Sequence, residues 1–164
     1  MHTPHTNKFV STKVIELGSC AFRQWRATHS HCCKLHGYRL TAKFWFGATK
    51  LDEKNWCVDF GGLKPLKEKL QHMFDHTTCV AADDPCIDQF LVLAEVGALD
   101  IRIMLNGVGA ERIAEYCYNV SAEYIKEKYG DRCWVEKVEV FEHEDNSAIY
   151  EKPIQSFYTG ININ

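Results

Sequence analysis

The stretch Tyr38-Arg39-Leu40-Thr41-Ala42-Lys43-Phe44-Trp45-Phe46 has the strongest alternation of the chain. Its odd-numbered positions carry Arg39, Thr41, Lys43 and Trp45, and its even-numbered positions are apolar or aromatic. Side chains of a strand point alternately to its two faces, so this pattern predicts a half-buried strand. The rest of the fold has to supply the core against which its apolar face packs.

The flanking sequence supplies two amphipathic helices and further strands. Leu63, Leu66, Leu70, Met73 and Phe74 fall on one helical face, and a second long helix runs from Ala110 to about Gly130. We expect further extended segments at 14–26, 56–60, 100–105 and 134–142, the last being the final core strand, and a short helix from Asp83 to about Val96. This order predicts an α+β fold, with an antiparallel sheet carrying two long helices on one face.

The composition is that of one globular domain. The chain has 164 residues, 46% of them hydrophobic, and a net charge of −3 with no block of lysine or arginine, so nucleic acid is not an expected partner. No apolar run has the roughly 20 residues of a membrane span, and Met1–Lys8 lacks the apolar core of a signal peptide. We therefore expect a cytoplasmic protein without a membrane partner, in which the eight cysteines are reduced and most of them pack in the core.

The segment from His29 to His36 contains three histidines, at 29, 31 and 36, and two cysteines, at 32 and 33. Imidazole is the commonest protein ligand for zinc, and a thiolate beside a cation is a nucleophile and a base. The segment therefore indicates metal-assisted chemistry with a cysteine. Tyr38 stands where another histidine would complete a better site.

Four motifs follow one another along the chain: Cys32-x-x-x-His36-Gly37, Val58-Asp59-Phe60-Gly61-Gly62-Leu63-Lys64 at a helix start, Phe74-Asp75-His76 at that helix's end, and Gly109-Ala110-Glu111 at the start of the second helix. In this order they resemble the 6-pyruvoyltetrahydropterin synthase / 6-carboxytetrahydropterin synthase family. Glu142, with Tyr150 eight residues later, matches the family's closing pair. The resemblance covers roughly residues 27–150, and C-x-x-x-H-G alone would be a weak signal.

The resemblance implies the tunnelling fold, or T-fold. Each subunit would contribute a four-stranded antiparallel sheet and two helices to an oligomeric barrel, a homo-hexamer in the family, with active sites between chains. Burial of the sheet edges against neighbouring subunits would also protect the strongly apolar strand Tyr38–Phe46 from aggregation. We expect one such domain over residues 1–152, with an insertion at about 79–106, followed by a loosely held tail at 153–164.

The resemblance also implies a zinc site. His36 matches the first histidine of the family's His-Gly-His, and Tyr38 replaces the second. His29 matches the histidine of the preceding strand, and the short connection that follows it would let His31 supply the missing imidazole. One interpretation is a Zn²⁺ site of His29, His31 and His36 with an open fourth position. The other is a site that has lost its metal, and both stay open.

Three further residues match the family's proton-transfer groups. Cys32 matches the catalytic cysteine, whereas Cys33 is expected to pack on the other side. Asp75 and His76 match an Asp-His relay, in which the aspartate would hold the imidazole in one tautomer. The alternatives are a surface thiol at Cys32 and an imidazolium at His76 that is stabilised by the helix C-terminus.

Glu142 is the expected pterin-binding residue. One carboxylate can accept two parallel hydrogen bonds from the N3–H and 2-amino group of a pterin. The alternative is an exposed strand glutamate like its acidic neighbours. Glu111 is expected to interact with the helix N-terminus rather than a ligand, and Gly109 replaces a pterin-binding threonine of the family.

Together these residues predict a zinc-dependent lyase acting on 7,8-dihydroneopterin triphosphate. Cysteine rather than glutamate at position 32 disfavours the family's folate-type branch. We favour a 6-carboxytetrahydropterin synthase, for 7-deazaguanine and queuosine biosynthesis, because that branch is the more widespread. The alternatives are a 6-pyruvoyltetrahydropterin synthase and a non-catalytic T-fold protein that binds a pterin or purine at a degenerate zinc site.

Overall fold

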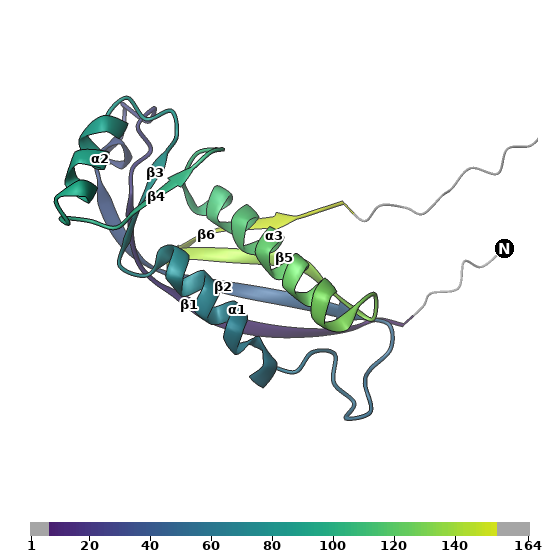
Figure 1. Ribbon diagram of the computed structural model, residues 1–164. Helices are drawn as coiled ribbons and strands as arrows, with labels where there is room; N and C mark the ends of the chain where they lie inside the picture. Colours follow the sequence, from purple (N-terminus) through teal and green to yellow (C-terminus); the bar gives the residue numbers. More distant parts are fainter. Residues whose placement is uncertain (1–6, 154–164) are drawn as a thin grey trace, which may run out of the picture.

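The computed structural model describes residues 7–153, which form a curled sheet with helices on one face (Figure 1). The described strands are β1 (Phe9–Phe22), β2 (His36–Ala48), β3 (Thr77–Ala81), β4 (Ile101–Met104), β5 (Cys133–His143) and β6 (Asn146–Glu151). The helices are α1 (Lys64–Phe74), α2 (Ile87–Glu95) and α3 (Ala110–Tyr129), and short 3-10 turns, η1 (His31–Cys33) and η2 (Gly61–Leu63), precede β2 and α1. The α+β class is therefore confirmed.

The sheet has six strands in the described part of the chain, in the order β4-β3-β1-β2-β5-β6. Neighbours from β1 through β2 and β5 to β6 are antiparallel, whereas β3 runs parallel to both β1 and β4. The predicted sheet of four antiparallel strands therefore had too few strands. It omitted β3, a five-residue strand that is buried throughout, and the edge strand β6.

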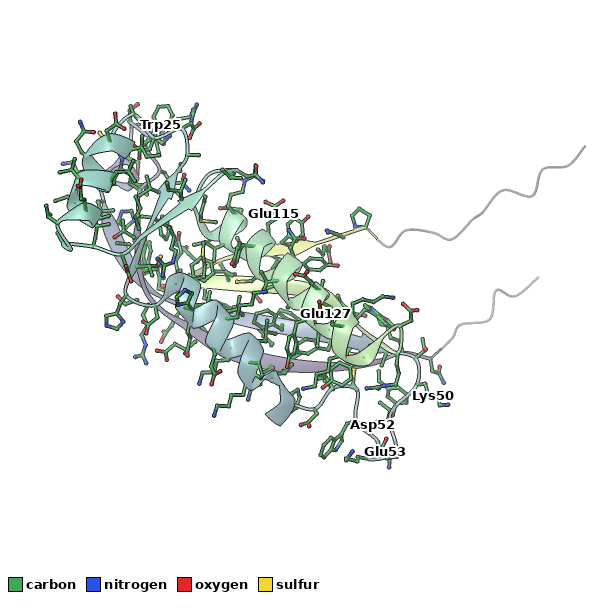
Figure 2. All side chains as sticks on the ribbon, viewed as in Figure 1. Trp25, Lys50, Asp52, Glu53, Glu115 and Glu127 are labelled. Carbon is green, nitrogen blue, oxygen red and sulfur yellow. The ribbon has the colours of Figure 1, made fainter. Side chains whose placement is uncertain are left out.

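The predicted strand at 56–60 was wrong, because this segment is a turn in the structure. The Asp52 carboxylate accepts hydrogen bonds from the amides of Lys54 and Trp56, and the Asp52 amide donates to the Trp56 carbonyl. An aspartate that binds amides two and four residues ahead curls the backbone away from an extended course. Asp52 and Glu53 lie at the opposite end of the sheet from Trp25 (Figure 2).

The core lies between the sheet and the two long helices, as the alternation of β2 predicts. Leu40, Ala42, Phe44 and Phe46 are all fully buried on the helix-covered face. They meet the apolar faces of α1 and α3, which include the buried residues Leu66, Leu70, Phe74, Ile113, Ala114, Cys117 and Ile125. Figure 1 shows α1 and α3 on the same face, while α2 lies with β3 and β4 at one end of the sheet.

The eight cysteines are all free thiols, and five of them are buried. No helix of the described chain is long and apolar enough to cross a membrane. Of the predicted tail at 153–164, everything after Pro153 lies outside the described residues.

Candidate functional site

The Asp75–His76 pair is held by a β-bulge in β1. The register of β1 against β2 shifts between Glu16 and Gly18, and the Asp75 carboxylate lies against the backbone at this bulge. Gly18 has a φ of +109°, and a Cβ at this position would collide with the Asp75 side chain. Glycine at position 18 therefore allows both the bulge and the close approach of Asp75.

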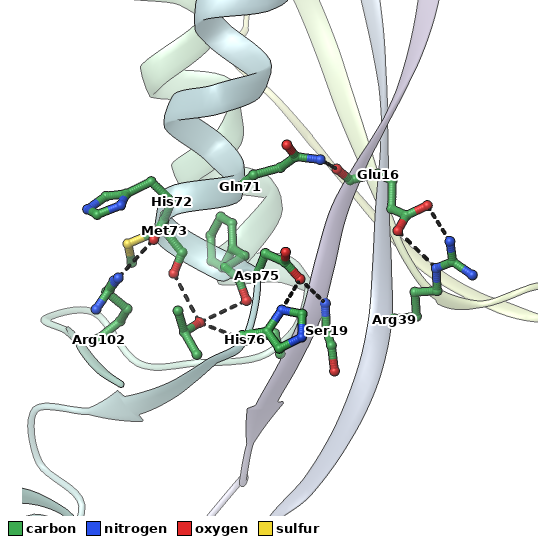
Figure 3. Close-up of polar contacts among 12 residues, drawn as sticks. Glu16, Ser19, Arg39, Gln71, His72, Met73, Asp75, His76 and Arg102 are labelled. Atoms are coloured by element: carbon green, nitrogen blue, oxygen red, sulfur yellow. Dashed lines mark hydrogen bonds and ion pairs between the residues drawn. The ribbon is translucent and has the colours of Figure 1, made fainter. Parts of the chain in front are cut away.

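Backbone and side-chain bonds fix the pair from both sides (Figure 3). The Ser19 amide donates to Asp75 Oδ1 at 3.0 Å, and the His76 amide donates to the Ser19 carbonyl at 2.7 Å. His76 has a φ of +57°, a left-handed conformation that is uncommon for residues other than glycine. Two hydrogen bonds to one residue of β1 thus stabilise a conformation that the chain would otherwise avoid.

The geometry suits proton transfer by His76. Its Nδ1 lies 2.9 Å from Asp75 Oδ1, and the side chain is 86% exposed. The hydrogen bond from the Ser19 amide lowers the pKa of Asp75, so the carboxylate is ionised near neutral pH and can accept the Nδ1 proton of His76. Nε2 then faces the surroundings with its lone pair, as a general base requires.

Cys32 lies in η1, the turn that joins β1 to β2. The Ser30 hydroxyl accepts from the Cys32 amide at 3.2 Å, and the Gln24 amide donates to the Cys32 carbonyl at 2.8 Å. The Cys32 thiol is exposed, whereas Cys33 is half-buried. Cys32 is therefore the more accessible of the two thiols, and its catalytic role stays a prediction.

Arg23 ties this turn to the segment before α2. Its guanidinium donates to Asp84 Oδ2 at 2.8 Å and Oδ1 at 2.6 Å, and its Nη1 donates to the Cys33 carbonyl at 3.3 Å. Arg23 lowers the pKa of the buried Asp84 carboxyl. This role was not predicted from the sequence, in which nothing marks Arg23 and Asp84 as partners rather than Arg26 and Asp83.

The structure does not assemble the predicted zinc ligands. Within residues 7–153, no three His, Cys, Asp or Glu side chains are placed to hold one metal ion. His29 and His31 lie in the exposed turn region, while His36 begins β2, where its Nε2 contacts the Tyr38 hydroxyl at 3.2 Å. The residues therefore do not fit a zinc ion within one chain.

Glu142 lies near Tyr38 at the end of β5. Burial raises the pKa of the Tyr38 phenol, and the charges of Glu142 and then Cys32 raise it further. The register of β5 against β6 shifts between Phe141 and His143, which places Glu142 in an irregular part of the ladder. The structure thus brings Cys32, Tyr38 and Glu142 into one neighbourhood. Among the described residues, no hydrogen bond connects this neighbourhood directly with the Asp75–His76 pair.

Gln24 occupies the space beside Gly109. Its Nε2 donates to the Val108 carbonyl at 2.7 Å and lies where a Cβ of residue 109 would be. Gly109 has a φ of +123°, and Glu111 lies in the first turn of α3, as expected for a residue at a helix N-terminus. A groove of about 310 Å³ is lined by Gln24, Asn106 and Val108. The glycine at position 109 was apparent from the sequence, whereas the approach of Gln24 to it was not.

Comparisons with known proteins agree with this architecture. An uncharacterised protein from Wolinella succinogenes is similar over 90% of this chain and 99% of its own, with a TM-score of 0.75 and 16% identity. The 6-pyruvoyl tetrahydropterin synthase of Plasmodium vivax gives a TM-score of 0.64 at 17% identity, covering 89% of this chain and 99% of that one. That of Caenorhabditis elegans gives 0.61 at 15% identity, covering 90% and 97%.

The sequence itself supports the same relationship. No curated protein matches the chain significantly. A family model does, over residues 14–153, and it is described as 6-pyruvoyl tetrahydropterin synthase. This range runs from the first strand to the end of the described residues and includes every candidate site residue. The chain therefore belongs to the 6-pyruvoyl tetrahydropterin synthase family.

Proposed function

We propose that this protein is a lyase that acts on 7,8-dihydroneopterin triphosphate and forms 6-carboxytetrahydropterin, a precursor of 7-deazaguanines. The observation that carries the proposal is the Asp75–His76 pair, an oriented and exposed imidazole held by the bulge at Gly18. Family membership supports the lyase class and the pterin substrate. The 6-pyruvoyl product, which retains the side-chain carbons, is the alternative outcome of the same chemistry.

Three groups would share the work. Glu142 would accept the N3–H and 2-amino hydrogen bonds of the pterin and so orient its side chain. Cys32 Sγ and His76 Nε2 would take and return protons at the side-chain carbons while triphosphate leaves. His76 is oriented for this role by Asp75, and the exposed Cys32 thiol is accessible to a substrate.

Incubation with 7,8-dihydroneopterin triphosphate tests the proposal. Mass spectrometry should detect triphosphate and 6-carboxytetrahydropterin, with acetaldehyde as the second carbon product. A 6-pyruvoyl product without acetaldehyde would favour the other branch. Triphosphate release should disappear in His76→Ala and persist in His72→Ala. His72 lies in the last turn of α1, and its backbone carbonyl, rather than its ring, accepts from Arg102.

A second candidate is binding of a pterin or purine without turnover. The observation that favours it is the failure of the described histidines to form a metal site. Calorimetry separates the two functions, because a binder would take up neopterin triphosphate and its dihydro form without releasing triphosphate. Loss of pterin binding in Glu142→Gln is expected for both.

We also propose that the active site forms between chains of a homo-oligomer, a hexamer by family resemblance. Family membership supports this arrangement. Mixed oligomers of Cys32→Ala and His76→Ala chains test it. Random mixing should restore about a quarter of wild-type turnover if the two residues of a site come from different chains. No recovery, although native mass spectrometry shows mixing, would place both residues in one chain.

A further inference from the structure

Both nitrogens of the His36 ring are engaged by neighbouring groups. Nδ1 lies 2.7 Å from the Lys34 carbonyl oxygen, and Nε2 lies 3.2 Å from the Tyr38 hydroxyl. A carbonyl oxygen only accepts hydrogen bonds, so Nδ1 has to carry the ring proton. Nε2 of the neutral ring is then an acceptor, and the Tyr38 hydroxyl donates to it. The contacts therefore select one tautomer.

The orientation of the two rings is fixed by packing as well as by this bond. The Tyr38 and His36 rings meet edge to face, with centroids 5.1 Å apart and planes at 79°. Phe22 packs against both of them, at 6.0 Å from His36 and 5.8 Å from Tyr38, and is itself fully buried. A change of rotamer at either ring would disturb this cluster, so the hydroxyl stays at Nε2.

A zinc ion at His36 would have to displace the Tyr38 hydroxyl. Zinc sites in proteins use three or four ligands, and a neutral phenol is a poor one. The other two candidate histidines lie in the turn that precedes β2. Backbone bonds from Ser30 to Ala27, at 3.0 Å, and from Lys34 to His31, at 3.0 Å, hold that turn closed. Within residues 7–153, His29 and His31 are not placed to share a metal ion with His36.

We propose that Tyr38 is a positioning residue that closes His36 to metal ions, because its hydroxyl engages Nε2 while Nδ1 faces the Lys34 carbonyl. The site at the start of β2 then binds its ligand without zinc. That this ligand is a pterin rests on the proposed function, whereas closure of His36 does not. Tyr38 thus performs a hydrogen-bonding role at the position where the family has a metal-binding histidine.

Zinc titration of the full chain, purified without a histidine tag and dialysed against EDTA, tests the metal. We expect no site with a dissociation constant below about 0.1 µM, the range of structural zinc sites. Stoichiometric zinc at that affinity, lost on His36→Ala, would overturn the proposal.

Nitrogen-15 NMR of the histidine rings tests the role of Tyr38. Wild-type His36, identified by its loss in His36→Ala, should show a protonated Nδ1 and an acceptor Nε2. In Tyr38→Phe, which keeps the ring packing, the Nε2 resonance should shift because its donor is gone. An unchanged resonance would show that the hydroxyl does not position His36.

Pterin calorimetry in EDTA separates this inference from the proposed function. Binding that is equal in EDTA and in zinc is the expected result. Binding that requires added zinc overturns the metal-free site. If no pterin binds under either condition, the proposed function fails, while the zinc titration and the NMR still decide whether Tyr38 closes His36.

Discussion

Replacement of Asp84 by asparagine should destabilise the protein strongly, although the change is nearly isosteric. The Asp84 side chain is 1% exposed and forms two charge-assisted bonds with Arg23, whose own side chain is 20% exposed. Asparagine keeps one acceptor for Arg23 or for the Cys86 amide but removes the charge. Breaking a buried ion pair costs about 3–5 kcal/mol, and the partial exposure of Arg23 reduces this to about 2–3 kcal/mol.

Denaturant unfolding at one protein concentration measures this loss, which corresponds to about 5–10 °C in melting temperature for a chain of this size. Asp83→Asn is the matched control, because its ion pair with Arg26 is largely exposed and should contribute far less. Equal effects of the two variants would refute the idea that Arg23 and Asp84 anchor the turn of Cys32.

The pH dependence gives a second check on Asp84. Arg23 lowers the pKa of Asp84 in the folded protein relative to the unfolded chain. A depressed carboxyl pKa stabilises the fold above the unfolded value of about 3.9, and the effect is lost as the pH falls through the folded value. The difference between wild type and Asp84→Asn should therefore be constant near neutral pH and shrink below about pH 4.

Gly18→Ala should lower the free energy of unfolding by more than Gly97→Ala. Both glycines have a positive φ, but of the two only Gly18 lies against a side chain, that of Asp75. Equal losses of stability in urea titrations would contradict this prediction. Cys32→Ala should abolish triphosphate release with the oligomeric mass unchanged, and Cys33→Ala should retain activity, since only Cys32 is exposed; equal losses would reverse the assignment of the two thiols. Glu142→Gln should weaken calorimetric binding of neopterin by about 2–3 kcal/mol, or roughly 30- to 150-fold. Glu139→Gln is its control, because Glu139 binds the Ser147 hydroxyl, and similar binding by wild type and Glu142→Gln would exclude Glu142 as the pterin residue.

The elements that the sequence predicted well are those with long hydrophobic periods. The apolar residues of β2, α1 and α3 pack into one shared core. Their spacing in the sequence therefore follows the period of each element, which made these elements predictable. β3 carries no alternation because both of its faces are covered, and β6 is an exposed edge strand. The turn at 52–57 depends on one carboxylate that binds two amides, a contact that apolar periodicity does not encode.

The site was predictable where its geometry is local in sequence. Asp75 and His76 are adjacent, and the end of α1 brings them to β1, so their pairing followed from the motif. The Arg23–Asp84 ion pair joins residues 61 positions apart. Its two side chains are much less exposed than those of the neighbouring pair, Arg26 and Asp83, and this is the difference between the two pairs. Contacts of that kind depend on the tertiary fold, and residue type alone does not predict them.

The two departures from the family motif are both compensated within the chain. Tyr38 replaces a histidine, and its hydroxyl satisfies the nitrogen of His36 that a metal would have bound. Gly109 replaces a threonine, and the Gln24 amide fills the space that a side chain would have taken and binds the Val108 carbonyl. No buried side-chain nitrogen or oxygen in residues 7–153 lacks a hydrogen-bond partner. Both replacements thus keep their surroundings hydrogen-bonded, as expected if the proposed site binds its ligand without a metal ion.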